Sequence, residues 1–126
     1  MIGLVAALAT IVLTGLTFFQ IALAAGAPLG HLSWGGQNKI LPKKLRIASA
    51  SSIALYILFA LIALSKAGLV EIFPDRLFLT IMLWIITAYF YLGILLNGIS
   101  PSKYERYVMT PVAATLAILF SYLAIA

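Results

Sequence analysis

Four long apolar segments dominate the chain, and short polar stretches separate them. The segments cover approximately residues 2–25, 45–67, 77–96 and 108–126. Each is close to the roughly 20 residues with which an α-helix crosses a hydrocarbon core about 30 Å thick. Backbone polar groups in hydrocarbon must be satisfied within the segment itself, and a helix achieves this. The pattern predicts an all-α integral membrane protein, an antiparallel bundle of four transmembrane helices with left-handed packing, in a single domain over residues 1–126.

The predicted connections carry residues that end and begin helices. These connections are residues 26–44, 68–76 and 97–107. Ser102, followed three residues later by Glu105, is typical of a capping box, in which each side chain binds the backbone N–H group of the other residue. We therefore expect the fourth helix to begin near Ser102, and the Glu105 carboxylate to serve this cap.

The first apolar segment ends in Ala22-Leu23-Ala24, which resembles a signal-peptide cleavage site. No Lys or Arg precedes the segment, however, and it is longer than the apolar core of about 7–15 residues in a signal peptide. Its Leu, Ile, Val and Phe side chains favour membrane insertion by on the order of 4 to 7 kcal/mol, which outweighs the amide of Gln20. A first transmembrane helix is therefore the better interpretation.

Small and weakly polar residues recur at spacings of three and four in every segment. Since lipid tails are as apolar as leucine, close packing and interhelical hydrogen bonds select the buried face of a transmembrane helix. We expect these residues to face the bundle interior, either in close packing or around a polar cavity. They are Gly3, Ala7, Thr10, Thr14 and Thr17; Ser49, Ser52 and Tyr56; Thr80, Trp84, Thr87 and Tyr91; and Thr110, Ala114, Ala117 and Ser121.

Composition and charge support a membrane location. Apolar residues make up 64% of the 126 residues and charged residues only 9%, whereas soluble domains have about 25% charged residues. Six of the eight basic residues lie in residues 26–44 and 97–107 or directly beside them, and two lie near residues 68–76. The positive-inside rule then predicts a multi-pass protein of the cytoplasmic (inner) membrane, with the first and third loops cytoplasmic and both termini outside. Because the basic residues flank apolar spans, lipid headgroups explain them better than nucleic acid does.

Several kinds of chemistry lack the residues they need. There is no cysteine and only one histidine, so neither a thiol nor a convincing zinc site is expected. No known catalytic motif is present, and no ionisable residue lies deep in a span, which argues against a proton relay. We assign no catalytic residue, no metal and no cofactor, and an enzyme is the less favoured class.

Polar residues of the first and third loops are expected to meet at the cytoplasmic pole. Glycine-rich turns there allow backbone N–H groups to approach a ligand closely. Several of these candidates also have a simpler explanation. His31 is then a surface residue, Trp34 an interfacial anchor, and Gln20 a structural hydrogen-bonding group in the bundle. The ligand-binding candidates are Gln20, His31, Trp34, Gln37, Arg46, Asn97, Ser100, Ser102, Glu105 and Arg106.

The same loops carry a family resemblance. The chain has a GAPxG…WGG loop in residues 26–36, an LPxxLRxxS segment in residues 41–49, and the sequence NGISPS in residues 97–102 followed by Glu105-Arg106. In these features it resembles a group of short bacterial four-helix membrane proteins. The resemblance implies that the two loops on one side are the shared feature of the group, and it implies no particular activity.

Three hypotheses on function follow. The leading one is a protein that binds or transports a small ligand or a lipid headgroup at this pole, within the lipid bilayer and as a monomer or homodimer. The second is a non-catalytic accessory or assembly subunit with a membrane-protein partner. The third is a lipid- or quinone-modifying enzyme that uses His31 or Glu105 as its acid–base group.

Overall fold

The computed structural model describes all 126 residues and contains helices but no strands. Four α-helices are each long and apolar enough to cross a membrane. They confirm the predicted four-helix membrane bundle, and two short 3₁₀ turns lie between the first and second helices. The elements are α1 (Ile2–Ala24), η1 (Gly30–Leu32), η2 (Trp34–Gly36), α2 (Lys43–Lys66), α3 (Arg76–Gly98) and α4 (Lys103–Ile125).

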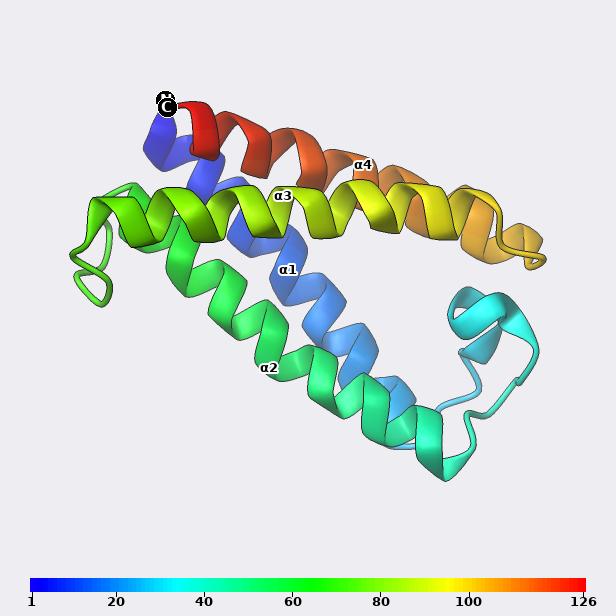
Figure 1. Cartoon of the computed structure of the whole chain (residues 1–126). Helices are drawn as coiled ribbons and strands as arrows, with labels where there is room; N and C mark the ends of the chain where they lie inside the picture. The colour runs from blue at the N-terminus through cyan, green and yellow to red at the C-terminus, as the bar shows by residue number, and fades with distance from the viewer.

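The helices form two antiparallel hairpins, α1–α2 and α3–α4 (Figure 1). Both chain termini and the α2–α3 connection lie at one end of the bundle, which we call the closed end. The first loop, residues 26–42, and the α3–α4 connection lie at the opposite end, which we call the loop end. The hairpins pack together at the closed end and diverge toward the loop end, so the bundle is V-shaped (Figure 1).

Side-chain hydrogen bonds fix where α3 and α4 begin. Asp75 caps α3, because its Oδ1 accepts hydrogen bonds from the backbone N–H groups of Leu77 at 2.9 Å and Phe78 at 3.3 Å. Ser102 caps α4, because its Oγ accepts from the N–H of Glu105 at 3.3 Å. Side-chain oxygens at these positions satisfy N–H groups that have no partner within the helix. The predicted start of the fourth helix near Ser102 is therefore confirmed.

The core is densest where the hairpins converge. Four alanines from three helices have no exposed surface, and this lets the helix backbones approach closely. Large apolar side chains fill the space between these contacts. The alanines are Ala6, Ala9, Ala63 and Ala117, and the large side chains with almost no exposure include Leu13, Ile62, Leu83, Ile86, Leu116 and Phe120.

The predicted interior faces are right in part. Ser49, Tyr56, Thr87 and Ala117 are buried as expected. The prediction is wrong for Thr14, Trp84 and Tyr91, which are exposed. Thr14 needs no partner in the interior, because its hydroxyl donates to the carbonyl of Thr10 in its own helix at 2.7 Å. On α3 the inner face is instead formed largely by aliphatic and aromatic side chains, namely Leu79, Leu83, Ile86 and Phe90.

Candidate functional site

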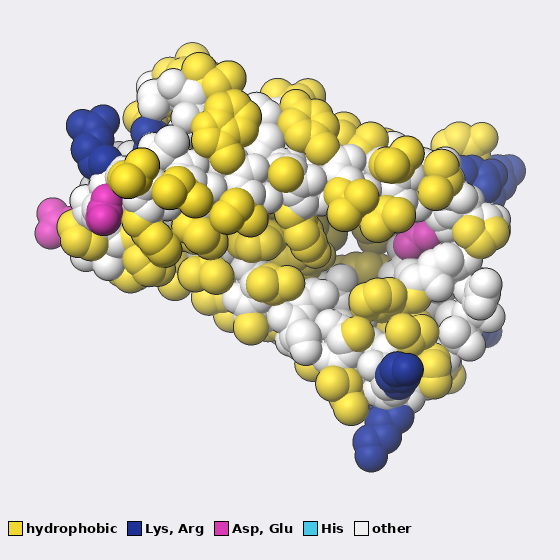
Figure 2. All heavy atoms as spheres, in the orientation of Figure 1, with side chains coloured by type: hydrophobic (Ala, Val, Ile, Leu, Met, Phe, Trp, Pro, Cys, Tyr) yellow, Lys and Arg dark blue, Asp and Glu magenta, His cyan; other side chains and the backbone are white.

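A cavity of about 520 Å³ lies between the two hairpins toward the loop end, within the ~300–1,000 Å³ that is usual for small-molecule sites. Figure 2 shows it as a hollow between the hairpins, with an acidic side chain at its edge. The walls come from all four helices and the first loop. Its polar lining includes Gln20, Ser33, Trp34, Ser52, Tyr56, Tyr89, Asn97, Ser100 and Glu105, and its apolar lining includes Leu16, Phe19, Leu92, Leu96, Met109 and Val112.

Glycines allow the first loop to close the loop end of this cavity. The N–H of Gly30 donates to the carbonyl of Lys39 at 2.8 Å, and a Cβ on Gly30 would overlap the Asn38 carbonyl. Gly36 has a φ of +70°, and a Cβ there would overlap the side chain of Ser102. The Ser102 hydroxyl in turn donates to the carbonyl of His31. The loop is therefore docked directly on the start of α4.

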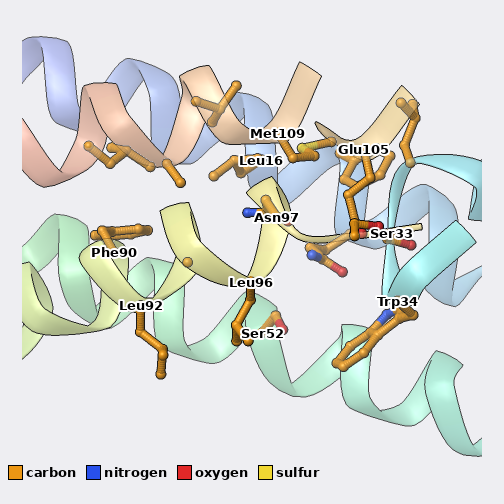
Figure 3. Close-up of a pocket in the computed structure, with 18 of the residues that line it drawn as sticks. Leu16, Ser33, Trp34, Ser52, Phe90, Leu92, Leu96, Asn97, Glu105 and Met109 are labelled. Carbon is orange, nitrogen blue, oxygen red and sulfur yellow. The ribbon is translucent and has the colours of Figure 1, made fainter. Parts of the chain in front are cut away.

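Trp34 binds the same loop to α2, in the α1–α2 hairpin. Its indole Nε1–H donates to the hydroxyl of Ser49 on α2 at 3.1 Å, and Ser49 is fully buried. Trp34 is also the one non-glycine residue with a positive φ, +51°, a conformation that costs an L-residue about 1–2 kcal/mol. The loop holds this strained residue so that its ring lines the cavity (Figure 3).

The Glu105 carboxylate is not used in the predicted capping box. The backbone N–H of Ser102, which the box assigns to Glu105, donates instead to the hydroxyl of Ser100 at 3.1 Å. One hydrogen bond of the box forms, because the N–H of Glu105 donates to Ser102 Oγ. The predicted reciprocal bond, from the N–H of Ser102 to the Glu105 carboxylate, is wrong. Glu105 is only 7% exposed, and its side chain points from α4 into the cavity near Ser33 and Asn97 (Figure 3). The structure thus leaves a buried acidic group facing the cavity.

The two candidate arginines serve the fold and do not line the cavity. Arg46 Nε donates to the carbonyl of Ala24 at 2.8 Å, and so binds one of the carbonyls that the C-terminus of α1 leaves without a helical partner. Arg106 Nη1 donates to the carbonyl of Ser100 at 2.7 Å and stabilises the α3–α4 turn.

Three further candidates lie outside the cavity wall. The His31 ring packs edge-on against Tyr104 with a centroid separation of 5.1 Å. Gln37 is exposed, and Ser102 is occupied by its two hydrogen bonds. Of the ten predicted ligand-binding residues, the fold brings five to one cavity: Gln20, Trp34, Asn97, Ser100 and Glu105.

Two buried polar atoms of the cavity wall have no hydrogen-bond partner. They are Oε1 of Gln20 and Oγ of Ser33, and both side chains are more than nine-tenths buried. The Tyr56 hydroxyl lies beside the Gln20 side chain. An unsatisfied buried polar group costs about 1–3 kcal/mol, so a ligand that supplied hydrogen-bond partners here would be stabilised.

Sequence reasoning did not select Ser33 or Tyr89 as site residues. Ser33 sits between the two 3₁₀ turns and is buried only because the first loop folds back. Tyr89 lies one position from the buried face of α3 and reaches the cavity because the hairpins diverge. Ser52 and Tyr56 did carry a signal, since both belong to the small and polar stripe of α2.

Taken together, four apolar helices indicate a multi-pass membrane protein, and the divergence of its hairpins forms a cleft with one polar end. In comparisons with protein-family models, curated proteins and solved structures, nothing matches this chain.

Proposed function

We propose that the protein binds an amphiphilic small molecule or a single lipid in the cleft, as a binding or transport protein. The polar part of the ligand lies at the loop end, and its apolar part lies between the hairpins. The observation that carries this proposal is that one cavity combines apolar walls with two buried polar atoms that lack hydrogen-bond partners, Gln20 Oε1 and Ser33 Oγ, and with the largely buried acidic side chain of Glu105.

The position of the opening supports a ligand that arrives from the bilayer. Within each hairpin the helices pack closely, whereas α2 and α3 pack much less against each other. The hollow between the hairpins faces outward through this gap, and apolar side chains surround it (Figure 2). An amphiphile could therefore enter sideways without its tail crossing water.

Fluorescence offers a direct test, because the two tryptophans report different environments. Trp34 is 43% exposed but lines the cavity, whereas Trp84 is 48% exposed and lies on α3 outside the cavity wall. In a Trp84→Phe protein in detergent, a neutral ω-bromoalkyl alcohol that enters the cavity will quench Trp34 with a saturable dependence on concentration. In the Trp34→Phe protein, the same compound will quench Trp84 only in proportion to its concentration in the micelle.

Adjacent serines of α2 provide a matched pair of variants. Ser52 lines the cavity and Ser51 is exposed, and each hydroxyl binds the carbonyl four residues earlier in its own helix. Ser52→Phe should fill the cavity and remove the saturable quenching, while Ser51→Phe should keep it. Saturable quenching that survives Ser52→Phe, or that never appears in the Trp84→Phe protein, would refute the proposed function.

We also propose the orientation that the charges predict, with the loop end in the cytoplasm. Six basic residues lie at or beside this end and two at the other. Because the chain has no cysteine, single cysteines at the exposed positions Gln37 and Glu71 can be labelled from either side of intact cells. A membrane-impermeant thiol reagent should label Glu71→Cys and spare Gln37→Cys, and the reverse result would invert the topology.

A further inference from the structure

We infer that the ligand of the cleft carries a cationic headgroup, an ammonium or a similar nitrogen cation, which pairs with the carboxylate of Glu105. This inference rests on the proposed function and names the chemical class of its ligand. It follows from the charges that line the cavity, from what the neighbouring cations bind, and from the aromatic ring at the same end.

Glu105 is the one acidic or basic residue of the cavity wall. The other lining residues are apolar or neutral polar. The Glu105 carboxylate accepts none of the hydrogen bonds that hold the surrounding turn together, which go to Ser100 and Ser102. A buried carboxylate without a partner is costly, and a cation in contact with it would offset that cost.

No basic residue of the cavity wall supplies this partner. Arg106 follows Glu105 directly, yet its guanidinium binds the carbonyl of Ser100, and Arg46 binds the carbonyl of Ala24. Neither arginine lines the cavity. An anionic headgroup would therefore meet the Glu105 carboxylate with no cation in the wall, whereas a cationic headgroup meets an acceptor.

The other polar groups at this end also suit a nitrogen cation. Trp34 lines the cavity from the first loop, opposite α4 (Figure 3), and the face of an indole ring is the strongest aromatic partner for a cation. The amide oxygen of Asn97 and the hydroxyl of Ser33 can accept hydrogen bonds from an ammonium group. Leu16, Leu92 and Val112 leave an apolar space for the attached chain.

The overall charge of the protein predicts the opposite preference, which makes the inference testable. The net charge is +5, and the loop end carries most of the basic residues. Long-range electrostatics would thus attract anions to this pole. Only groups in direct contact with the ligand, above all the Glu105 carboxylate, favour a cation there.

The experiment compares three ω-bromoalkyl amphiphiles of equal chain length with trimethylammonium, hydroxyl and carboxylate headgroups, by saturable quenching of Trp34 in the Trp84→Phe protein. We expect the ammonium compound to bind roughly tenfold more tightly than the alcohol, equivalent to about 1.4 kcal/mol, and the carboxylate compound to bind most weakly. Glu105→Gln should remove most of the difference in affinity between the ammonium compound and the alcohol. Glu71→Gln, at the closed end, should change neither affinity.

The outcomes separate this inference from the proposed function. If the ammonium preference survives Glu105→Gln, or if the carboxylate compound binds as tightly as the ammonium compound, the cationic headgroup is wrong while a saturable cleft stands. If the alcohol itself shows no saturable quenching, the cleft does not bind amphiphiles and the proposed function fails. An unchanged circular dichroism spectrum and a cooperative unfolding transition show that Glu105→Gln is folded, and Glu105→Asp should restore part of the ammonium preference.

Discussion

The two ends of the bundle are built from similar apolar helices but pack in opposite ways. At the closed end, fully buried alanines such as Ala9 and Ala117 bring the helices together around Leu13 and Phe120. From the middle of the helices, where Tyr56 and Tyr89 lie, toward the loop end, the hairpins separate and leave a cavity of about 520 Å³. The first loop hydrogen-bonds to both hairpins, through Ser102 and Ser49, and closes the loop end of the cavity.

This contrast shows how a small membrane protein can leave a cavity between its helices with no charged residue deep inside its spans. Close packing in hydrocarbon depends on small side chains, because the hydrophobic effect does not drive helices together there. At the closed end, fully buried alanines of both hairpins supply such contacts. The cleft and the strained residue Trp34 both lie at the less tightly packed end, and backbone strain in proteins clusters at functional sites.

The largest effect should come from adding the same side chain at both ends. Ala9→Phe places a large ring at a fully buried helix contact and should lower the free energy of unfolding by about 3 kcal/mol, because overpacking forces the helices apart. Ser52→Phe, which points into the cleft, should change stability by less than about 1 kcal/mol. Unfolding by SDS in mixed micelles measures both. Ala88→Phe, on the exposed face of α3, is the control, and equal losses for Ala9 and Ser52 would contradict the contrast between the ends.

The docking of the first loop on α4 can be broken at one glycine. Gly35 and Gly36 both have positive φ, but a Cβ on Gly36 would overlap Ser102, whereas a Cβ on Gly35 has only contacts near 4 Å, the nearest of them Pro101 Cγ at 3.9 Å. Gly35→Ala should cost about 1 kcal/mol from backbone strain alone. Gly36→Ala should cost about 2 kcal/mol or more and shift the Trp34 emission to longer wavelength as the loop leaves α4. Identical emission and stability for the two variants would show that the loop does not depend on this contact.

A smaller effect is expected where the loop meets α2. Ser49→Ala removes the acceptor of the Trp34 Nε1–H and should lower stability by about 1 kcal/mol. Ser51→Ala, on the exposed side of the same helix, should have no measurable effect. Thermal unfolding followed by circular dichroism compares the two. A Ser49→Ala protein as stable as Ser51→Ala would mean that the indole bond does not hold the loop.

The smallest effect is predicted within the α3–α4 hairpin. The Tyr91 and Ser121 hydroxyls lie 3.2 Å apart and form an interhelical hydrogen bond near the lipid surface. A double-mutant cycle with Tyr91→Phe and Ser121→Ala should give a coupling energy of about 0.6 kcal/mol, the average for such bonds in membranes. A coupling well above the roughly 1.7 kcal/mol maximum measured elsewhere would show that this hairpin depends on polar contacts more than on packing.

The sequence alone determined the four helices, the placement of two loops at the same pole, and the start of α4 at Ser102. These features depend on local quantities, namely the length of apolar runs and the capping groups beside them, so they can be read without a fold. It also supplied Gln20, Trp34, Asn97, Ser100 and Glu105 as members of a larger candidate set, but it could not separate them from Arg46 and Arg106.

Only the tertiary structure decided which faces of the helices are buried and which candidates meet. Thr14 and Tyr91 satisfy the same spacing rule as Ser49, yet only Ser49 is buried, because small and polar stripes do not specify the neighbouring helix. The Ser102 N–H had two possible acceptors within three residues, and the fold gave it to Ser100. The Glu105 side chain points into the cleft and is buried there by residues of other elements, which depends on how the helices and the first loop pack in three dimensions.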